Sequence, residues 1–253
     1  MSKEPSNDHH RPVAYKNGRF LDSPDARPLR ILSEYLQPYA HFRREKVRDT
    51  IVFFGSSRTA EDHSLGRYYR EARELARRLT EWSEQLPDTS RRFVVCTGGG
   101  PGIMEAANRG AFDCDAKSVG LNISLPYEQF PNPYVSPELC FLFHYFAMRK
   151  LHFMSRAKAL VAFPGGYGTF DELFEALALI QTRKIKPLPI ILVGEEFWRQ
   201  AFDMDFLVAE GVIDAEDKDL FRFAESAADI WEGILRWYDE SGESLFSASR
   251  VAQ

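Results

Sequence analysis

The chain has 253 residues, which is enough to bury a full hydrophobic core in one domain with room for an appendage. Its composition, with 44% hydrophobic and 27% charged residues and a formal net charge of −5, is that of a globular protein and argues against a general nucleic-acid binder. No run approaches ~18 uninterrupted apolar residues and the N-terminus has no apolar signal core, so we expect a cytoplasmic protein without a membrane span.

The first 48 residues are predicted to form an N-terminal extension with a short helix. They are polar to about residue 22, and a broad apolar face then runs at helical spacing from Leu29 to Phe42. Pro38 is expected to bend this helix or end it early, because proline removes a backbone hydrogen bond. We expect the extension to pack on the main domain or on a second subunit.

The main domain is predicted to span residues 49–240, followed by a polar tail at 241–253. Apolar runs alternate with segments of helical periodicity, which predicts a Rossmann-like α/β fold, a doubly wound parallel sheet with helices on both faces. Strands are predicted at 50–54, 93–96, 118–123, 139–143, 159–163, 188–193 and 220–223. Helices are predicted at 65–82, 103–112, around 148–150, 173–180, 197–210 and 227–238.

Three glycine-containing turns follow predicted strands, at Gly55, at residues 98–102 and at residues 165–168. Ligands of parallel α/β sheets bind at the carboxyl ends of the strands. We therefore expect the three turns to open on the same edge of the sheet.

The most informative segment is Phe163-Pro164-Gly165-Gly166-Tyr167-Gly168-Thr169-Phe170-Asp171-Glu172, between a strand and a helix. Glycines let the backbone pass close to a ligand, and the N–H groups of the first helical turn point at it unpaired, so this order predicts an anion site. Thr169 adds a hydroxyl. The Glu172 carboxylate is unexpected beside a phosphate cradle, unless it handles a proton, a sugar hydroxyl or a developing cation.

Each part of this pattern also has a plainer interpretation. The turn at 98–102 is compatible with a tight connection that binds nothing; it lacks the G-x-G-x-x-G spacing of dinucleotide sites and the Gly-Lys-Ser/Thr of a P-loop. Arg149 and Lys150 are compatible with ordinary helix-surface charge, and Glu172 with a carboxylate favoured by the helix dipole. The three cysteines have no metal-type spacing, so we expect no metal.

Three blocks together resemble the LOG ("lonely guy") family of cytokinin-activating phosphoribohydrolases and their bacterial relatives, many of which carry the label "lysine decarboxylase-like". The blocks are residues 98–104, Arg149-Lys150 and residues 164–172, and the resemblance covers about residues 49–240. It implies a Rossmann-like fold, a homodimer or an assembly of dimers, and no cofactor. The implied reaction is hydrolysis of a nucleoside 5′-monophosphate to the free base and ribose 5-phosphate.

The resemblance also implies roles for individual residues. Arg149 and Glu172 correspond to the family's catalytic arginine and glutamate. The implied substrate-binding residues are Ser56, Gly99, Gly100, Met104, Gly165, Gly166, Gly168 and Thr169. Asp171 stands where many members have a second glutamate, which leaves the role of this shorter carboxylate open. The stretch from Asn132 to Phe146 is closer to the larger bacterial members, so AMP is at least as good a candidate as a cytokinin nucleotide.

Two other functions remain open at this stage. Fold relatives of the family carry molybdenum cofactor, a phosphorylated pterin that the same glycine turn would suit without any catalytic pair. A decarboxylase would need pyridoxal phosphate on a lysine, and no recognisable lysine site accompanies the phosphate turn.

Overall fold

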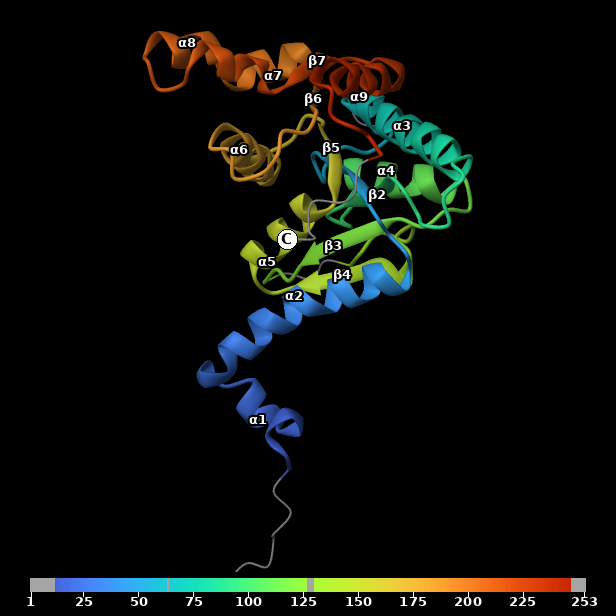
Figure 1. Cartoon of the computed structure of the whole chain (residues 1–253), viewed down its shortest axis with the longest axis vertical. Helices are drawn as coiled ribbons and strands as arrows, with labels where there is room; N and C mark the ends of the chain where they lie inside the picture. Colours follow the sequence, from blue (N-terminus) through green and yellow to red (C-terminus); the bar gives the residue numbers. More distant parts are fainter. Residues whose placement is uncertain (1–11, 63, 127–129, 247–253) are drawn as a thin grey trace, which may run out of the picture.

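A computed structural model describes residues 12–62, 64–126 and 130–246 of the chain. Its centre is a seven-stranded sheet in which all neighbouring strands are parallel. The strands are β1 (Thr50–Phe54), β2 (Val94–Thr97), β3 (Val119–Ile123), β4 (Cys140–Phe143), β5 (Ala157–Ala162), β6 (Ile190–Val193) and β7 (Arg222–Ala224). The predicted fold class, a doubly wound α/β sheet, is confirmed (Figure 1).

The strand order is β4-β3-β2-β1-β5-β6-β7. The chain therefore builds outward from β1 to β4, returns to the middle, and places β5 on the free side of β1. From β1 the chain proceeds toward one edge of the sheet, through β2 and β3 to β4, and from β5 it proceeds toward the other edge, through β6 to β7. In open α/β sheets such a reversal creates a crevice at the carboxyl ends of the strands, where ligands bind.

Two helical layers cover the sheet, each over its own hydrophobic core. One layer consists of α3 (Gly66–Glu84), α4 (Ile103–Phe112) and α9 (Ala227–Ser241). The other consists of α2 (Arg27–Arg44), α5 (Phe146–Ser155), α6 (Tyr167–Gln181) and α7 (Glu195–Ala201). Strand β1 contributes side chains to both cores, because successive side chains of a strand point to opposite faces of the sheet. Ile51 and Phe53 lie in the core under α3, α4 and α9. Val52 and Phe54 lie in the core on the opposite face.

Of the two effects expected of Pro38, a bend or an early end of its helix, the early end is wrong, because α2 continues to Arg44. A proline inside a helix has no N–H for the carbonyl four residues earlier, here that of Glu34. The Glu34 carbonyl instead lies 3.0 Å from Nε2 of His152 on α5. A contact with another helix, which no local pattern reveals, thus replaces the hydrogen bond that Pro38 removes.

The single helix predicted over 197–210 is also wrong. The segment forms α7 and a separate α8 (Met204–Ala209), with extended backbone at Phe202 between them. Phe202 turns its ring toward Phe174 and Phe221, and the Asp203 side chain accepts a hydrogen bond from the Phe206 N–H to start α8. The packing of one aromatic ring and one capping hydrogen bond therefore outweigh helical periodicity here.

The last strand lies slightly later than predicted. Residues Ala215–Leu220 form a 3₁₀ helix, and β7 begins at Arg222. Asp214 and Asp217 form a reciprocal capping box at the start of this 3₁₀ helix. The capping box stabilises the helical conformation of the segment that precedes β7.

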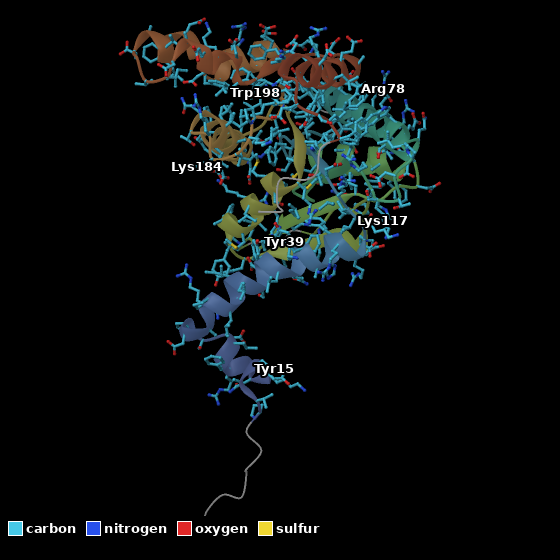
Figure 2. All side chains as sticks on the ribbon, viewed as in Figure 1. Tyr15, Tyr39, Arg78, Lys117, Lys184 and Trp198 are labelled. Carbon is cyan, nitrogen blue, oxygen red and sulfur yellow. The ribbon has the colours of Figure 1, made fainter. Side chains whose placement is uncertain are left out.

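The N-terminal segment is more helical than expected. It contains a 3₁₀ turn at Ala14–Lys16, α1 (Gly18–Leu21), a second 3₁₀ turn at Pro24–Ala26 and the 18-residue α2. Figure 2 shows Tyr15 on the part that projects from the body and Tyr39 where α2 meets it. The C-terminal half of α2 is anchored by Phe42, which is buried in the core beneath α5.

The C-terminal segment was predicted to be a polar tail, but its described residues 241–246 include two apolar side chains that pack on the domain. Leu245 is buried in the core on the α3 side, and the Phe246 ring packs against Trp82 and Phe93. Within the described ranges, no helix combines the length and the apolar character needed to cross a membrane.

Candidate active site

A cavity of about 900 Å³ opens at the carboxyl ends of β1, β2 and β5, beside the reversal in strand order. All three glycine turns reach this edge, as predicted. The lining residues are Phe54, Gly55, Ser56, Ser57, Arg58, Gly98, Met104, Phe146, Arg149, Gly166, Tyr167, Gly168, Thr169, Phe170, Asp171, Glu172 and Ala201.

Backbone hydrogen bonds hold the three turns together at Ser56. The Ser56 N–H donates to the Pro164 carbonyl at 3.0 Å, and the Ser56 carbonyl accepts from the Ile103 N–H at 3.1 Å. Gly102 has a φ of +72°, and a Cβ there would lie 2.3 Å from the Ser56 oxygen. Only glycine permits this approach, so the start of α4 is fixed against the β1 turn.

The N-terminus of α6 faces the cavity. The helix begins at Tyr167, six residues before the predicted start at residue 173, so Gly168 and Thr169 lie in its first turn. No side chain caps this end of the helix. Its first N–H groups therefore have no partner within the helix and form, with the helix dipole, a site suited to an anion.

Arg149 and Glu172 meet at the floor of the cavity. Nη2 of Arg149 lies 3.8 Å from Oε1 of Glu172, and the two side chains are only 13% and 7% exposed. The arginine comes from the first turns of α5 and the glutamate from α6. The guanidinium also lies over the Phe153 ring at 5.3 Å, and its Nε is buried without a hydrogen-bond partner.

Burial dominates the electrostatics of this pair. It raises the pKa of Glu172 to about 7, although the positive charges of Arg149 and Lys150 act in the opposite direction. Burial also lowers the pKa of Arg149, against the effect of Glu172. Arginine remains charged in proteins, so the protonation state of Glu172 is the one that changes near neutral pH. A carboxyl group poised there suits proton transfer or stabilisation of a cation.

Asp171 is held apart from this pair. Its carboxylate lies 2.8 Å from Nζ of Lys150, and the same ammonium is 3.1 Å from Glu175. The Asp171 side chain is 53% exposed at the edge of the cavity. The two adjacent acids of the motif therefore have different surroundings. Glu172 is buried, whereas Asp171 is exposed to solvent and forms an ion pair with Lys150.

Seven of the ten site residues expected from the sequence line the cavity: Ser56, Met104, Arg149, Gly166, Gly168, Thr169 and Glu172. Gly99, Gly100 and Gly165 do not line it, and each contacts other parts of the protein. Gly99 has a φ of +71° and abuts Asn122, while the Gly100 carbonyl accepts a hydrogen bond from Asn132. A Cβ at Gly165 would lie 2.1 Å from Oγ1 of Thr169.

Sequence reasoning missed several lining residues. Gly98 lies in a turn that was singled out, yet its particular role depends on a neighbour: a Cβ there would lie 2.9 Å from both Arg149 Nη2 and Met104 Sδ. Arg58 follows the β1 turn, where its positive charge is the one local feature that marks it. Phe146 and Ala201 come from α5 and α7, where no motif marks them.

Among the described residues, no group of three or more His, Cys, Asp or Glu side chains is arranged to hold a metal ion. Cys96 is fully buried beneath the site, and burial raises the pKa of its thiol. A thiol in this state is inert and serves as a small apolar side chain.

A family model described as possible lysine decarboxylase matches residues 104–234. The chain is 32% identical over 114 residues to the pyrimidine/purine nucleotide 5′-monophosphate nucleosidase of Escherichia coli K12, a match that covers 41% of this chain and 25% of that protein. It therefore spans only a quarter of that relative. The chain is also 28% identical over 190 residues to a probable cytokinin riboside 5′-monophosphate phosphoribohydrolase, LOG4, of Oryza sativa subsp. japonica, covering 74% of this chain and 76% of the relative.

Two solved structures share the fold. One is the X-ray structure of TM1055, with a TM-score of 0.53 and 21% identity, covering 74% of this chain and 99% of that one. The other is a molybdenum cofactor binding protein from Rippkaea orientalis, with a TM-score of 0.51 and 18% identity, covering 76% and 98% of the two chains. At such identities the likeness concerns the fold alone.

Proposed function

Because the chain belongs to the family described as possible lysine decarboxylase, which is the LOG family that its motifs resemble, we propose that it hydrolyses the N-glycosidic bond of a nucleoside 5′-monophosphate. The products are the free base and ribose 5-phosphate. The observation that carries this proposal is the desolvated Arg149–Glu172 pair beside the uncapped N-terminus of α6 in one cavity. Two relatives named for cleavage of nucleoside monophosphates support it.

In the proposed complex the 5′-phosphate lies at the N-terminus of α6. The free N–H groups of the first turn and the Thr169 hydroxyl donate to its oxygens, and Gly166 and Gly168 have open space where a Cβ would stand. A phosphate fixed at this point supplies binding energy away from the reacting bond. Because the phosphate is held there, the ribose lies over Glu172, and the reacting C1′ atom is fixed in orientation relative to the carboxylate.

Glu172 acts at the ribose. As the bond from C1′ to the base nitrogen breaks, its electron pair leaves with the base and positive charge develops on the ribose ring. The ionised Glu172 stabilises that charge or orients the water whose oxygen attacks C1′. The water gives up one proton as the new C–O bond forms and the departing base takes one up, so the water is divided between the two products. Arg149 favours the ionised carboxylate and fixes its direction.

Two rival functions from the sequence analysis fit these residues less well. A carrier of a phosphorylated pterin would use the α6 N-terminus but has no need of a buried charged pair, and co-purified pterin fluorescence would reveal one. A decarboxylase would need a lysine for pyridoxal phosphate, whereas the described lining includes none, and Lys150 is paired with Asp171 and Glu175.

We also propose that the protein is a homodimer or an assembly of dimers. Leu142 on β4 and Phe146 and Leu151 on α5 expose 67%, 50% and 38% of their surfaces on neighbouring elements. Light scattering at several concentrations tests this, and a monomer at micromolar protein contradicts it.

The experiment that tests the proposed reaction is chromatography of the products after incubation with AMP, GMP, CMP, UMP, IMP and a cytokinin riboside monophosphate. Release of free base together with an equal amount of ribose 5-phosphate supports hydrolysis. Release of phosphate with intact nucleoside would contradict it.

A further inference from the structure

Glu34, on the N-terminal helix α2, contacts α5 at both ends of the helical segment that carries Arg149. Its carboxylate accepts hydrogen bonds from the backbone N–H groups of His144 at 2.8 Å and Tyr145 at 3.1 Å, just before α5 begins. Its backbone carbonyl lies 3.0 Å from Nε2 of His152, two turns further on. Figure 1 shows α2 running alongside α5 at the edge of the sheet.

The carboxylate contact holds the backbone that leads into α5. The side chain of the N-cap residue Tyr145 makes no capping hydrogen bond, and the Glu34 carboxylate binds the N–H groups of Tyr145 and of the residue before it. A carboxylate beside a helix N-terminus also interacts favourably with the helix dipole. The tether lies close to the catalytic pair, because the carbonyl of Tyr145 in turn accepts from the Arg149 N–H at 3.2 Å.

The carbonyl contact depends on Pro38. This proline has no N–H to offer the Glu34 carbonyl, so the carbonyl is free to bond outside its helix. A carbonyl oxygen only accepts, so Nε2 of His152 carries the proton and donates. His152 is nearly fully buried against the Tyr35 and Tyr39 rings, three residues beyond Arg149 on α5. The helix is thereby fixed in rotation as well as at its start.

We propose that Glu34 is a positioning residue for Arg149. By fixing the start and the rotation of α5, it directs the guanidinium at Glu172 and at the cavity, so the N-terminal extension is part of what makes the site competent. Glu34 itself does not line the cavity. The inference rests on the proposed hydrolase function, because the effect appears in the turnover of a nucleotide.

The test begins with Glu34→Ala and Glu34→Gln, measured for kcat and KM on the nucleotide that the wild-type chain cleaves. Displacing a catalytic group by about 1 Å costs up to ~10²-fold in rate, so we expect Glu34→Ala to lower kcat by ~10-fold or more with a smaller change in KM. Glu34→Gln keeps one acceptor oxygen and should lie between Ala and wild type. Gln37→Ala, at an exposed position on the same helix, is the matched control and should keep wild-type kcat.

A double-mutant cycle distinguishes positioning from general destabilisation. If Glu34 acts through Arg149, then Glu34→Ala should lower kcat much less in an Arg149→Lys background than in the wild type. Equal fold-losses in both backgrounds would overturn the inference. Hydrogen exchange at the His144 and Tyr145 amides reports the tether directly, and unchanged protection in Glu34→Ala would also overturn it.

The failure of this inference is distinguishable from failure of the proposed function. If the wild type cleaves a nucleotide and Glu34→Ala retains full kcat, the positioning role is wrong and the hydrolase stands. If the wild type cleaves none, the proposed function is wrong and the positioning role falls with it.

Discussion

Arg149 and Glu172 lie close enough to attract each other but not to form a hydrogen bond, with 3.8 Å between Nη2 and Oε1. Both are buried, so each loses hydration that the other only partly replaces. This relationship leaves the carboxyl group of Glu172 with a pKa of about 7, raised by burial and held down by Arg149.

The first prediction concerns the pH dependence of kcat/KM. Since the proposed reaction uses ionised Glu172, whose pKa is raised to about 7, kcat/KM should rise with pH and level off above this value. A titration of initial rates from pH 5 to pH 9 on one nucleotide measures this limb. A profile that falls over the same interval would mean that the protonated form is the active one.

The second prediction concerns the stability cost of Glu172. A carboxyl group whose pKa is raised by folding is favoured in its protonated form, so its penalty appears as pH rises from its ordinary range through about 7 and is complete above that. Glu172→Gln should therefore gain free energy of unfolding relative to wild type by ~1–3 kcal/mol between pH 5 and pH 9. Urea unfolding at both pH values measures the difference, and a constant difference would contradict the raised pKa.

The third prediction separates the charge of Arg149 from its shape. Arg149→Met removes the positive charge that lowers the pKa of Glu172, so the rising limb of the residual kcat/KM should move to higher pH. Arg149→Lys keeps the charge and should move it less, although the planar fork is lost. Identical limbs in the two variants would show that Arg149 does not set the ionisation of Glu172.

The fourth prediction concerns Gly98. A Cβ there would stand 2.9 Å from Arg149 Nη2 and from Met104 Sδ, so Gly98→Ala should displace the guanidinium and lower kcat by ~10-fold or more while the protein stays folded. Gly233→Ala on α9 adds the same methyl group 3.3 Å from Ile191 Cδ1, far from the cavity, and serves as control. Equal activity of the two variants would remove Gly98 from the site.

Much of the fold followed from local pattern. The helix at Ile103–Phe112 and the strand at Thr50–Phe54 begin and end where the sequence predicted, because glycine and apolar periodicity mark their limits. The helices whose ends were predicted wrongly are those whose limits depend on contacts with residues distant in the sequence. Pro38 stays helical because His152 bonds the carbonyl it frees, and Phe202 breaks a helix because its ring packs with Phe174 and Phe221.

The site was predictable where a motif carries it. Glycine turns after three strands predicted a common edge, and the cavity lies there. The contacts of Gly99 with Asn122 and of Gly100 with Asn132 were not predictable, since these neighbours come from other segments. The burial that shifts Glu172 also depends on tertiary packing. Glu34, which is far from every motif, gave no local signal at all.

The measurement that tests the central claim most directly is base release by the wild type beside Glu172→Gln, using the six nucleotides named above and chromatographic detection. The account predicts free base and ribose 5-phosphate from at least one nucleotide, with a loss of ~10²–10⁴-fold in kcat for the variant. Circular dichroism verifies that the variant is folded. Wild-type turnover retained by Glu172→Gln, or no base from any nucleotide with a folded wild-type chain, would contradict it.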